Sequence, residues 1–302
     1  GLGDVYKRQT FNSAAIAGLL AARDGRFDAL LWVLVTAGLL FAHATNNLVN
    51  DLTDHWKGVD KDNYFRSQYG PQPLEHGLMT QSQVLQYIAV TGLIALAAGI
   101  ALVVLRGEAT LWLLGSGVFF VLFYTWPLKY IGMGEVAVIV VWGPLMVGGG
   151  YYVITGQITH DIVIASLPVA LAATTVLFGK HTDKLEADRA KGIRTMPVLL
   201  GERNARWATI GMLTLQYVLV LWLVATGALS WMMLIVFGAG NWYWLALRVY
   251  SQPRPAAPPA EYPPNIWPLW YAALAFQHTR RFGLLFLLGL VLDVAARRFG
   301  LV

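Results

Sequence analysis

The feature that most constrains this fold is a series of apolar segments, since a helix needs about 20 apolar residues to cross a bilayer. Hydrophobic residues make up 57% of the 302 residues and charged residues only 13%. The expected spans are 29–50, 82–105, 109–126, 134–154, 161–179, 205–225, 229–249 and 282–296. A shorter apolar stretch, 11–22, precedes them. The sequence therefore predicts an all-α integral membrane protein.

The first nine residues differ in character from the rest of the chain. Residues 1–9 read Gly-Leu-Gly-Asp-Val-Tyr-Lys-Arg-Gln, lack an initiator Met and resemble a translated adapter sequence. We interpret them as a non-native leader that replaces the front of a first helix. Residues 10–302 are then expected to form a single transmembrane domain, with pseudo-repeat halves at about 10–153 and 154–302.

The charge pattern argues for a membrane and against nucleic acid. The net charge is +5, but the basic residues are sorted by loop: fifteen belong to loops 51–81, 127–133, 180–206 and 248–281, and five belong to the opposite side. Basic loops stay on the cytoplasmic side of a membrane. Cysteine is absent, which excludes disulfides, thiolate catalysis and Cys-ligated metals.

Polar side chains at the end of the first expected span have helical spacing. Asn47, Asn50, Asp51 and Asp54 occupy positions i, i+3, i+4 and i+7, and His43 lies four residues before Asn47. If the helix continues, all of them share one face. Carboxylates and amides at the end of a membrane segment are costly unless they bind something, so this stripe predicts a binding site. A solvated, capped helix end explains one or two such groups but not the whole stripe.

The same order of features occurs again after segment 161–179, where an acidic cluster is followed by basic residues. The acidic residues are Asp183 and Asp188. The basic residues near the two clusters are Lys57, Arg66, Lys129, Lys184, Arg189, Lys191 and Arg194. Carboxylate and amide oxygens suit Mg²⁺ that is shared with phosphate oxygens, and the cations would neutralise the remaining phosphate charge. Diphosphate binding beside apolar helices indicates an isoprenyl diphosphate substrate.

Four motifs resemble the UbiA superfamily of intramembrane prenyltransferases, and the resemblance extends over residues 11–302. They are Asn50-Asp51-Leu52-Thr53-Asp54, Lys57-Gly58-Val59-Asp60, Tyr124-Thr125-Trp126-Pro127-Leu128-Lys129 and Asp188-Arg189-Ala190-Lys191-Gly192-Ile193-Arg194-Thr195. The Lys-Gly-Val-Asp run is similar to the menaquinone branch of the family.

This resemblance implies a ring of about nine transmembrane helices, the first one truncated, around a central apolar chamber. It implies Mg²⁺-dependent transfer of an isoprenyl chain from a polyprenyl diphosphate to an aromatic quinone precursor, 1,4-dihydroxy-2-naphthoate in the menaquinone branch. The implied catalytic residues are Asp51, Asp54, Asp188 and Lys129. The implied metal ligands are Asn47, Asp51, Asp54, Asp183 and Asp188. The implied substrate-binding residues are Asn47, Asn50, Lys57, Arg66, Tyr124, His181, Lys184, Arg189, Lys191 and Arg194.

One position departs from the family pattern. The second motif of the family places two Asp residues four apart, and here Lys184 stands at the first of those positions. Asp183 is five residues before Asp188, about 140° away on a regular helix, so both could bind one metal only if the helix breaks there. We expect Lys184 to contact diphosphate oxygens directly.

Two alternatives remain open at this stage. The acceptor could be a 4-hydroxybenzoate, a porphyrin-derived alcohol or a glycerol phosphate lipid. From another class, the chain could be a cation-coupled transporter, whose acidic groups would lie near the middle of the bilayer. Nothing in the sequence indicates an obligate protein partner.

Overall fold

The computed structural model describes residues 2–59, 72–260, 262–263 and 266–301, with side chains from Thr10 onward. Within these residues all regular secondary structure is helical, which confirms the all-α prediction. The chain forms two compact units, and each is described by itself. Unit 1 comprises Gly1–Tyr130 and Leu145–Ile158, and unit 2 comprises Ile131–Pro144 and Thr159–Val302.

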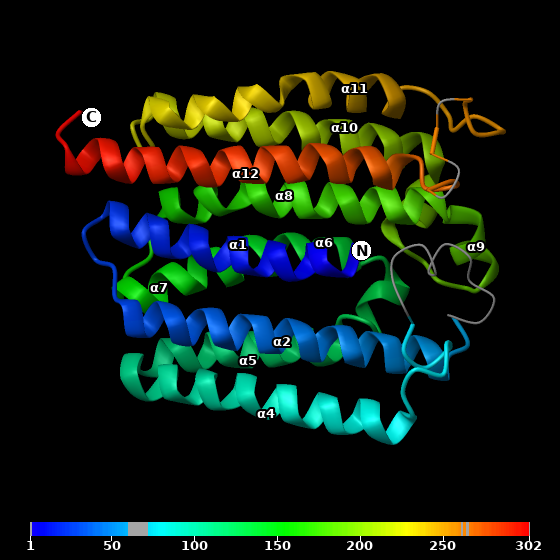
Figure 1. The fold of residues 1–302 in the computed structure, drawn as a ribbon, viewed down its shortest axis with the longest axis horizontal. Coiled ribbons are helices and arrows are strands. Elements are labelled where there is room, and N and C mark those ends of the chain that lie inside the picture. The colour runs from blue at the N-terminus through cyan, green and yellow to red at the C-terminus, as the bar shows by residue number, and fades with distance from the viewer. Residues whose placement is uncertain (1, 60–71, 261, 264–265, 302) are drawn as a thin grey trace. The chain divides into compact units, whose positions relative to one another are not determined.

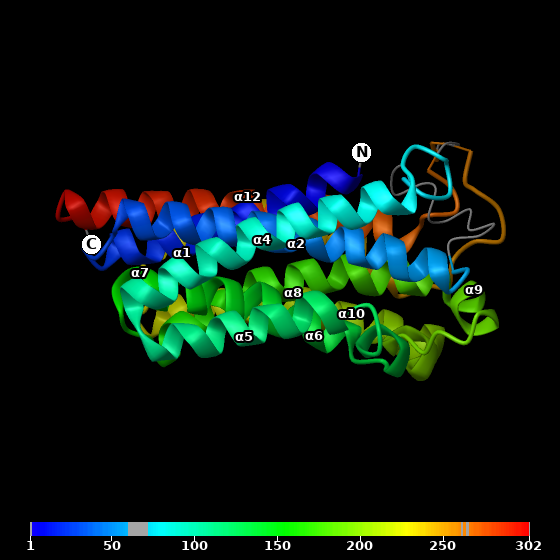
Figure 2. The same cartoon turned by 90° about the horizontal axis from the view of Figure 1, so that it is seen from below.

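Unit 1 is built around α2. Its helices are α1 (Leu2–Arg23), α2 (Ala29–Trp56), α4 (Gln81–Arg106), α5 (Glu108–Phe123) and α7 (Gly149–Thr155). Helix α2 packs against the other four, and α2 and α4 lie side by side in both views (Figures 1 and 2). Helix α2, whose C-terminal end carries the predicted stripe, is therefore the central helix of unit 1.

Local sequence signals set the ends of these helices. Asp28 caps α2, since its side chain accepts a hydrogen bond from the Leu31 N–H at 3.0 Å. Thr80 and Gln83 form a capping box at the start of α4. Helix α4 ends at Arg106, and Gly107 directly after it has a φ of +85°, which favours glycine.

Unit 2 is built around α8. Its helices are α6 (Gly134–Val140), α8 (His160–Asp183), α9 (Leu185–Ala190), α10 (Met196–Ala225), η3 (Trp231–Ala239), α11 (Gly240–Tyr250) and α12 (Tyr271–Arg298). Helix α8 packs against α6, α9, α10 and α12 (Figure 1). A glycine allows the close approach of α12, because a Cβ at Gly179 would lie 2.8 Å from backbone atoms of Ala272.

One helix changes its winding along its length. Between α6 and α7, residues Val141–Gly148 form a π-helix (η2) that contains Pro144. Proline has no backbone N–H to donate to the preceding turn, and π-type turns are a common accommodation of such a defect. The boundary between the two units falls directly after Pro144.

Six helices of the described residues are long and apolar enough to cross a membrane. They are Ala29–Trp56, Gln81–Arg106, Gly134–Thr155, His160–Asp183, Met196–Ala225 and Trp231–Tyr250. Helix α5 is apolar but shorter, and α12 carries Arg280, Arg281 and Asp293. Each of the eight predicted spans contains helix, whereas the count of nine transmembrane helices and the ring around a chamber stay predictions. Helix α1 begins at Leu2, inside the stretch interpreted as a leader.

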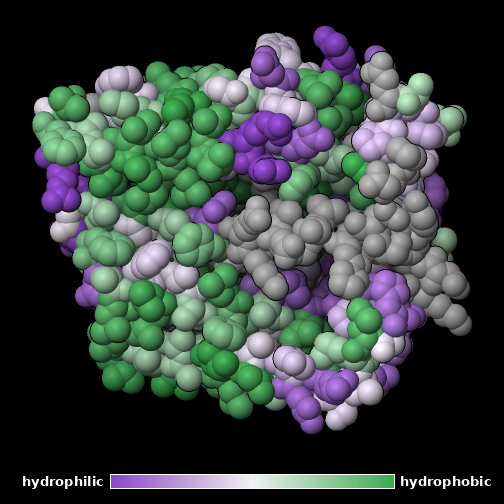
Figure 3. Space-filling model, in the orientation of Figure 1, coloured by the Kyte–Doolittle hydropathy of each residue, from purple (hydrophilic) through white to green (hydrophobic). Residues whose placement is uncertain are grey.

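Apolar side chains cover much of the outer face of α4 and α5. Val104 is 79% exposed and Trp112 is 74% exposed, values that fit contact with lipid chains better than with water. In Figure 3 hydrophobic residues dominate the face over α4, and hydrophilic residues gather toward the right of the view, where α4 begins and α2 ends.

Candidate active site

The predicted stripe lies on a continuous helix, because α2 extends to Trp56. Its side chains differ in exposure along the helix. Asn47 is exposed, Asn50 and Asp51 are half-buried, and Asp54 is buried with 3% of its surface exposed. The stripe therefore runs from the surface of unit 1 into its interior.

Asp54 forms a buried ion pair with Lys129. The Lys129 Nζ atom lies 3.0 Å from Asp54 Oδ1 and 2.7 Å from Oδ2. Lys129, 7% exposed, comes from the 3₁₀ turn η1 (Leu128–Ile131), and its backbone N–H donates to the Tyr124 carbonyl at 3.0 Å. Removing one partner of such a pair costs about 3–5 kcal/mol. The pair brings a carboxylate of α2 and the ammonium group of Lys129 together in the interior of unit 1.

Two amide side chains of α2, that of Asn50 in the stripe and that of Asn46 outside it, bind to the end of α5 and to the turn after it. Asn46 Nδ2 donates to the Val121 carbonyl, and Asn50 Nδ2 donates to Thr125 Oγ1, both at 3.2 Å. Because the Asn50 side chain donates this bond from its amide nitrogen, Oδ1 is the atom that can act as an acceptor.

A second cation of unit 1 is held by aromatic rings. The exposed Lys57 Nζ lies 5.3 Å from the ring centroid of Trp126 and 5.1 Å from that of Tyr130. These contacts keep an ammonium group near the end of α2 without neutralising it. Arg66 lies outside the described residues. Tyr124, at the end of α5, is half-buried.

In unit 2, the Asp183 carboxylate accepts three backbone hydrogen bonds. Its Oδ2 accepts hydrogen bonds from the backbone N–H groups of Trp270 and Ala272 at 3.0 and 2.9 Å, and its Oδ1 accepts one from Tyr271 at 2.9 Å. The side chain is buried, and it caps the start of α12. A metal at Asp183 would have to displace these donors, so the structure does not support the metal role that the resemblance implies.

Lys184 and Asp188 form an ion pair across a break in the helix. Helix α8 ends at Asp183, Lys184 is non-helical, and α9 begins at Leu185. The Lys184 Nζ atom lies 2.9 Å from Asp188 Oδ1, and the two side chains are 11% and 4% exposed. Asp188 Oδ2 is buried, and among the described residues it has no hydrogen-bond partner.

The other predicted cations of this segment face outward. Arg189 is exposed and pairs with Glu186 at 2.9 and 3.1 Å, and Lys191 and Arg194 are exposed as well. They remain accessible to an anionic ligand.

His181 has a partner that the sequence analysis missed. Its Nδ1 atom lies 2.5 Å from Glu135 Oε1, and the same oxygen accepts the Met196 N–H at 3.2 Å. Both side chains are buried. Glu135 gave no signal in the sequence, because an acidic residue in the first turn of a helix is common for reasons of the helix dipole. The pair links α6, α8 and the start of α10.

We expect Glu135→Gln to lower the free energy of unfolding by about 1 kcal/mol, which corresponds to a fall of about 2–4 °C in Tm. The glutamine keeps an acceptor for His181 but loses the charge. The control is Glu108→Gln, an exposed acidic residue in the first turn of α5. Thermal unfolding in detergent measures both variants, and equal Tm values would show that the pair contributes nothing.

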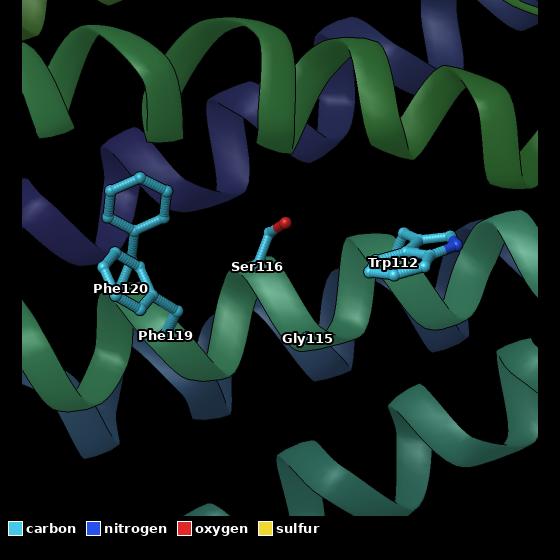
Figure 4. Close-up of a pocket in the computed structure, with 5 residues that line it drawn as sticks. All are labelled: Trp112, Gly115, Ser116, Phe119 and Phe120. Atoms are coloured by element: carbon cyan, nitrogen blue, oxygen red, sulfur yellow. The ribbon is translucent and has the colours of Figure 1, made fainter.

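An apolar hollow lies along α5. Its volume is about 290 Å³, and Trp112, Gly115, Ser116, Phe119 and Phe120 line it (Figure 4). The Ser116 hydroxyl is the only side-chain polar group among these residues apart from the Trp112 ring N–H. None of the predicted site residues lines this hollow, so it is separate from the charged clusters.

The donor atoms of the first cluster fit Mg²⁺. Among the described residues, no three His, Cys, Asp or Glu side chains gather closely enough to hold a metal alone. Mg²⁺ in phosphate-binding sites, however, uses one or two carboxylates and completes its shell with waters and substrate oxygens. Asp51, with the Asn50 side-chain oxygen beside it in the stripe, supplies that kind of donor set, whereas both oxygens of Asp54 contact the Lys129 ammonium.

Comparisons with known proteins agree with the fold and the motifs. A model of the UbiA prenyltransferase family matches residues 12–274. The chain is 32% identical over 208 residues to the 1,4-dihydroxy-2-naphthoate octaprenyltransferase of Escherichia coli (strain K12), a match that covers 65% of this chain and 66% of that protein, just under two thirds of its length.

Two solved structures share the fold. The apo structure of a UbiA homolog from Aeropyrum pernix K1 aligns with a TM-score of 0.71 at 16% identity, covering 95% of this chain and 98% of that one. A UbiA homolog from Archaeoglobus fulgidus bound to GPP and Mg²⁺ aligns with a TM-score of 0.56 at 17% identity, covering 96% and 99%. Together with six membrane-length helices, the family match confirms the predicted resemblance: this chain is an integral membrane protein that belongs to the UbiA prenyltransferase family.

Proposed function

We propose that this protein is a Mg²⁺-dependent prenyltransferase that moves an isoprenyl chain from a polyprenyl diphosphate to an aromatic quinone precursor. The observation that carries the proposal is the Asp54–Lys129 pair at the buried end of the Asn/Asp stripe, with Nζ–O distances of 3.0 and 2.7 Å. The proposed acceptor is 1,4-dihydroxy-2-naphthoate, supported by the relative from Escherichia coli and by the Lys57-Gly58-Val59-Asp60 run.

The first cluster binds the diphosphate head of the substrate. When bound, Mg²⁺ would neutralise the negative charge that develops on the leaving diphosphate. Asp51 and Asp54 would hold that ion, and Asn47 and Asn50 would add neutral oxygen ligands. The Lys129 ammonium, oriented by Asp54, and the Lys57 ammonium, held over two rings, donate hydrogen bonds to phosphate oxygens.

The second cluster is a further set of residues that we propose to bind phosphate. Lys184, Lys191, Arg189 and Arg194 contact phosphate oxygens, and Asp188 orients Lys184 through the 2.9 Å ion pair. Because the basic residues of the chain concentrate in the loops that carry both clusters, we propose that the site opens to the cytoplasm.

The reaction breaks the allylic C–O bond, and the electron pair leaves with the diphosphate. The allylic cation then forms a C–C bond with an electron-rich ring carbon of the acceptor, and that carbon loses a proton. The chain contributes by holding the leaving group in place and by surrounding the cation with apolar helices that exclude water. This scheme also explains why both acidic clusters stand at helix ends and not at mid-span, where a cation-coupled transporter would need them.

The test is a product assay on purified protein in lipid nanodiscs. Farnesyl, geranylgeranyl and longer all-trans diphosphates are incubated with 1,4-dihydroxy-2-naphthoate, 4-hydroxybenzoate or a glycerol phosphate lipid, and products are identified by mass. We expect prenylated naphthoate with Mg²⁺ and none with EDTA. Product with another acceptor alone would refute the proposed acceptor, and no diphosphate release with any pair would refute the activity.

A further inference from the structure

A run of five polar residues interrupts the apolar sequence of α12. Residues 277–281 read Gln-His-Thr-Arg-Arg and lie between the apolar stretches 272–276 and 282–292. Two of the five are buried and have partners inside unit 2. The His278 Nε2 atom lies 2.9 Å from the Tyr217 hydroxyl, and Thr279 Oγ1 donates to the Ala172 carbonyl at 2.9 Å. The part of the run that faces the interior is therefore satisfied by the fold.

The arginines of the run face outward. Arg280 is exposed, and within the described part of the chain no group forms a hydrogen bond or an ion pair with its guanidinium. Arg281 is half-buried, with its guanidinium carbon 3.7 Å from the ring centroid of Trp242 on α11, and its Nη1 atom donates to the Gln277 carbonyl at 3.2 Å. A guanidinium stacked on a ring keeps in-plane N–H groups that can donate further. Two adjacent cations thus stand on one side of α12, and no described carboxylate neutralises either.

An apolar stripe continues from Arg280 along the same face of α12. Leu284, Leu288 and Val291 follow Arg280 at i+4, i+8 and i+11 and are 66%, 42% and 47% exposed. Eleven residues of helix span about 16 Å, close to the thickness of one leaflet of the hydrocarbon core, about 15 Å. In Figure 3 a group of hydrophilic residues lies over α12, and hydrophobic residues cover the surface to its left, toward the C-terminal end of that helix (Figure 1).

The position of Arg280 along α12 lets its guanidinium reach the edge of the hydrocarbon core. The helix has 28 residues, about 42 Å, so a helix centred in a core of about 30 Å projects about 6 Å at each end. Arg280 is the tenth residue, about 14 Å from the first, Tyr271, and its Cα then lies about 8 Å inside the core. A long side chain directed toward the helix N-terminus spans most of that distance. The charge therefore stands near the depth of lipid phosphates.

We propose that Arg280 and Arg281 bind the phosphate of an anionic phospholipid, in the leaflet at the end of α12 that Asp183 caps. One acyl chain of this lipid lies along Leu284, Leu288 and Val291. An uncompensated charge on an apolar surface is costly in a bilayer, and this ligand supplies the counter-charge and the apolar chain together. Arginine donates paired hydrogen bonds to phosphate oxygens. The site lies within unit 2 alone, and it would exist whether or not the protein transfers isoprenyl chains.

Native mass spectrometry of the purified full chain, released from detergent micelles, counts the lipids that stay bound. The probes are palmitoyl-oleoyl phosphatidylglycerol and palmitoyl-oleoyl phosphatidylcholine, whose phosphate brings its own ammonium group. We expect one tightly bound phosphatidylglycerol, with a Kd at least about fivefold below that of phosphatidylcholine. In Arg280→Gln the two Kd values should become equal. The control is Arg203→Gln, which removes the same charge at an exposed position of α10 between Glu202 and Asn204 and should keep the site.

Two further variants separate the charge from the apolar stripe. Arg280→Lys keeps the charge without the paired donors and should have an intermediate Kd for phosphatidylglycerol. Leu284→Gln keeps both cations and should weaken phosphatidylglycerol binding about threefold, because the acyl chain loses an apolar contact. Since both positions are exposed, we expect native Tm values for all of these variants in detergent alone. Phosphatidylglycerol should raise the Tm of the native chain but not that of Arg280→Gln.

Four results would overturn the proposal. The first is equal phosphatidylglycerol affinity in the native chain and Arg280→Gln, and the second is equal affinity of the native chain for the two lipids. The third is displacement of phosphatidylglycerol by an equal concentration of glycerol 3-phosphate, which would identify a site for free anions. The fourth is a co-purifying polypeptide that Arg280→Gln loses and phosphatidylglycerol does not displace, which would assign the two arginines to a helix of a partner protein.

Discussion

Replacing Asp51 by Asn is expected to lower kcat by at least about 1,000-fold while leaving Tm unchanged. The substitution keeps the shape of the side chain but removes a charge that stabilises the metal and, through it, the leaving diphosphate, and losses of about 10²- to 10³-fold follow even from removing one preorganised donor. Diphosphate release at saturating Mg²⁺ measures kcat, and thermal unfolding in detergent measures Tm.

Asp54→Asn is expected to lower both quantities, because Asp54 also neutralises the buried Lys129. The double variant Asp54→Asn/Lys129→Met removes both charges, so its Tm should recover while its activity does not.

Thr53→Ala, at a half-buried position between the two Asp residues, is the control. Leu52→Ala is unsuitable, since Leu52 is only 4% exposed and its truncation would cost about 2–5 kcal/mol. Native rates in Asp51→Asn would contradict the metal assignment.

Asp183→Ala is expected to destabilise the protein by about 3 kcal/mol or more. Three backbone N–H groups at the start of α12 would lose their acceptor, and each buried unsatisfied donor costs about 1–3 kcal/mol. Asp183→Asn should have an intermediate effect. Its single oxygen can keep the two bonds that Oδ2 now accepts from Trp270 and Ala272, but the bond from Tyr271 is lost.

Activity per folded molecule separates a structural role from a metal role at this position. For Asp183→Asn we expect a lower Tm with nearly native kcat once the folded fraction is measured. For Asp188→Asn we expect the reverse, a strong rise in KM for the prenyl diphosphate with a smaller change in Tm. Asp161→Asn, at the exposed opposite end of α8, is the control. A large fall in kcat of folded Asp183→Asn would show that its carboxylate binds the metal after all.

Much of the fold follows from the sequence, because the membrane demands long apolar helices and because helical spacing alone places the stripe on one face. Helix α2 continues through Asp51 and Asp54 as that spacing requires. The helix ends are less predictable. Helix α8 was expected to end at residue 179 but extends to Asp183, since His181 and Asp183 are satisfied by partners from other helices. A hydropathy profile counts these residues as polar, so the helix end that it predicts comes too early.

For the site too, what could not be predicted is which residues, distant in the sequence, contact each other in the fold. Lys129 was expected near the acidic residues on grounds of charge, and the structure places it against Asp54, 75 residues away. The partner of Asp183 could not be predicted, because it is a row of backbone N–H groups that carry no sequence signal. Glu135 was missed for a similar reason, since only the fold shows that its oxygen lies 2.5 Å from His181.

The cap that Asp183 places on α12 also has a consequence for biosynthesis. The carboxylate belongs to α8, yet its first donor, the Trp270 N–H, is made 87 residues later. Until the ribosome has added that stretch, α8 holds a carboxylate without the donors that satisfy it in the finished fold. A nascent chain released before residue 270 would therefore leave the Asp183 carboxylate at the end of α8 without these three donors, a cost of several kcal/mol for a buried polar group. Helix α12 thus supplies the donors that complete the hydrogen bonding at the end of α8 within unit 2.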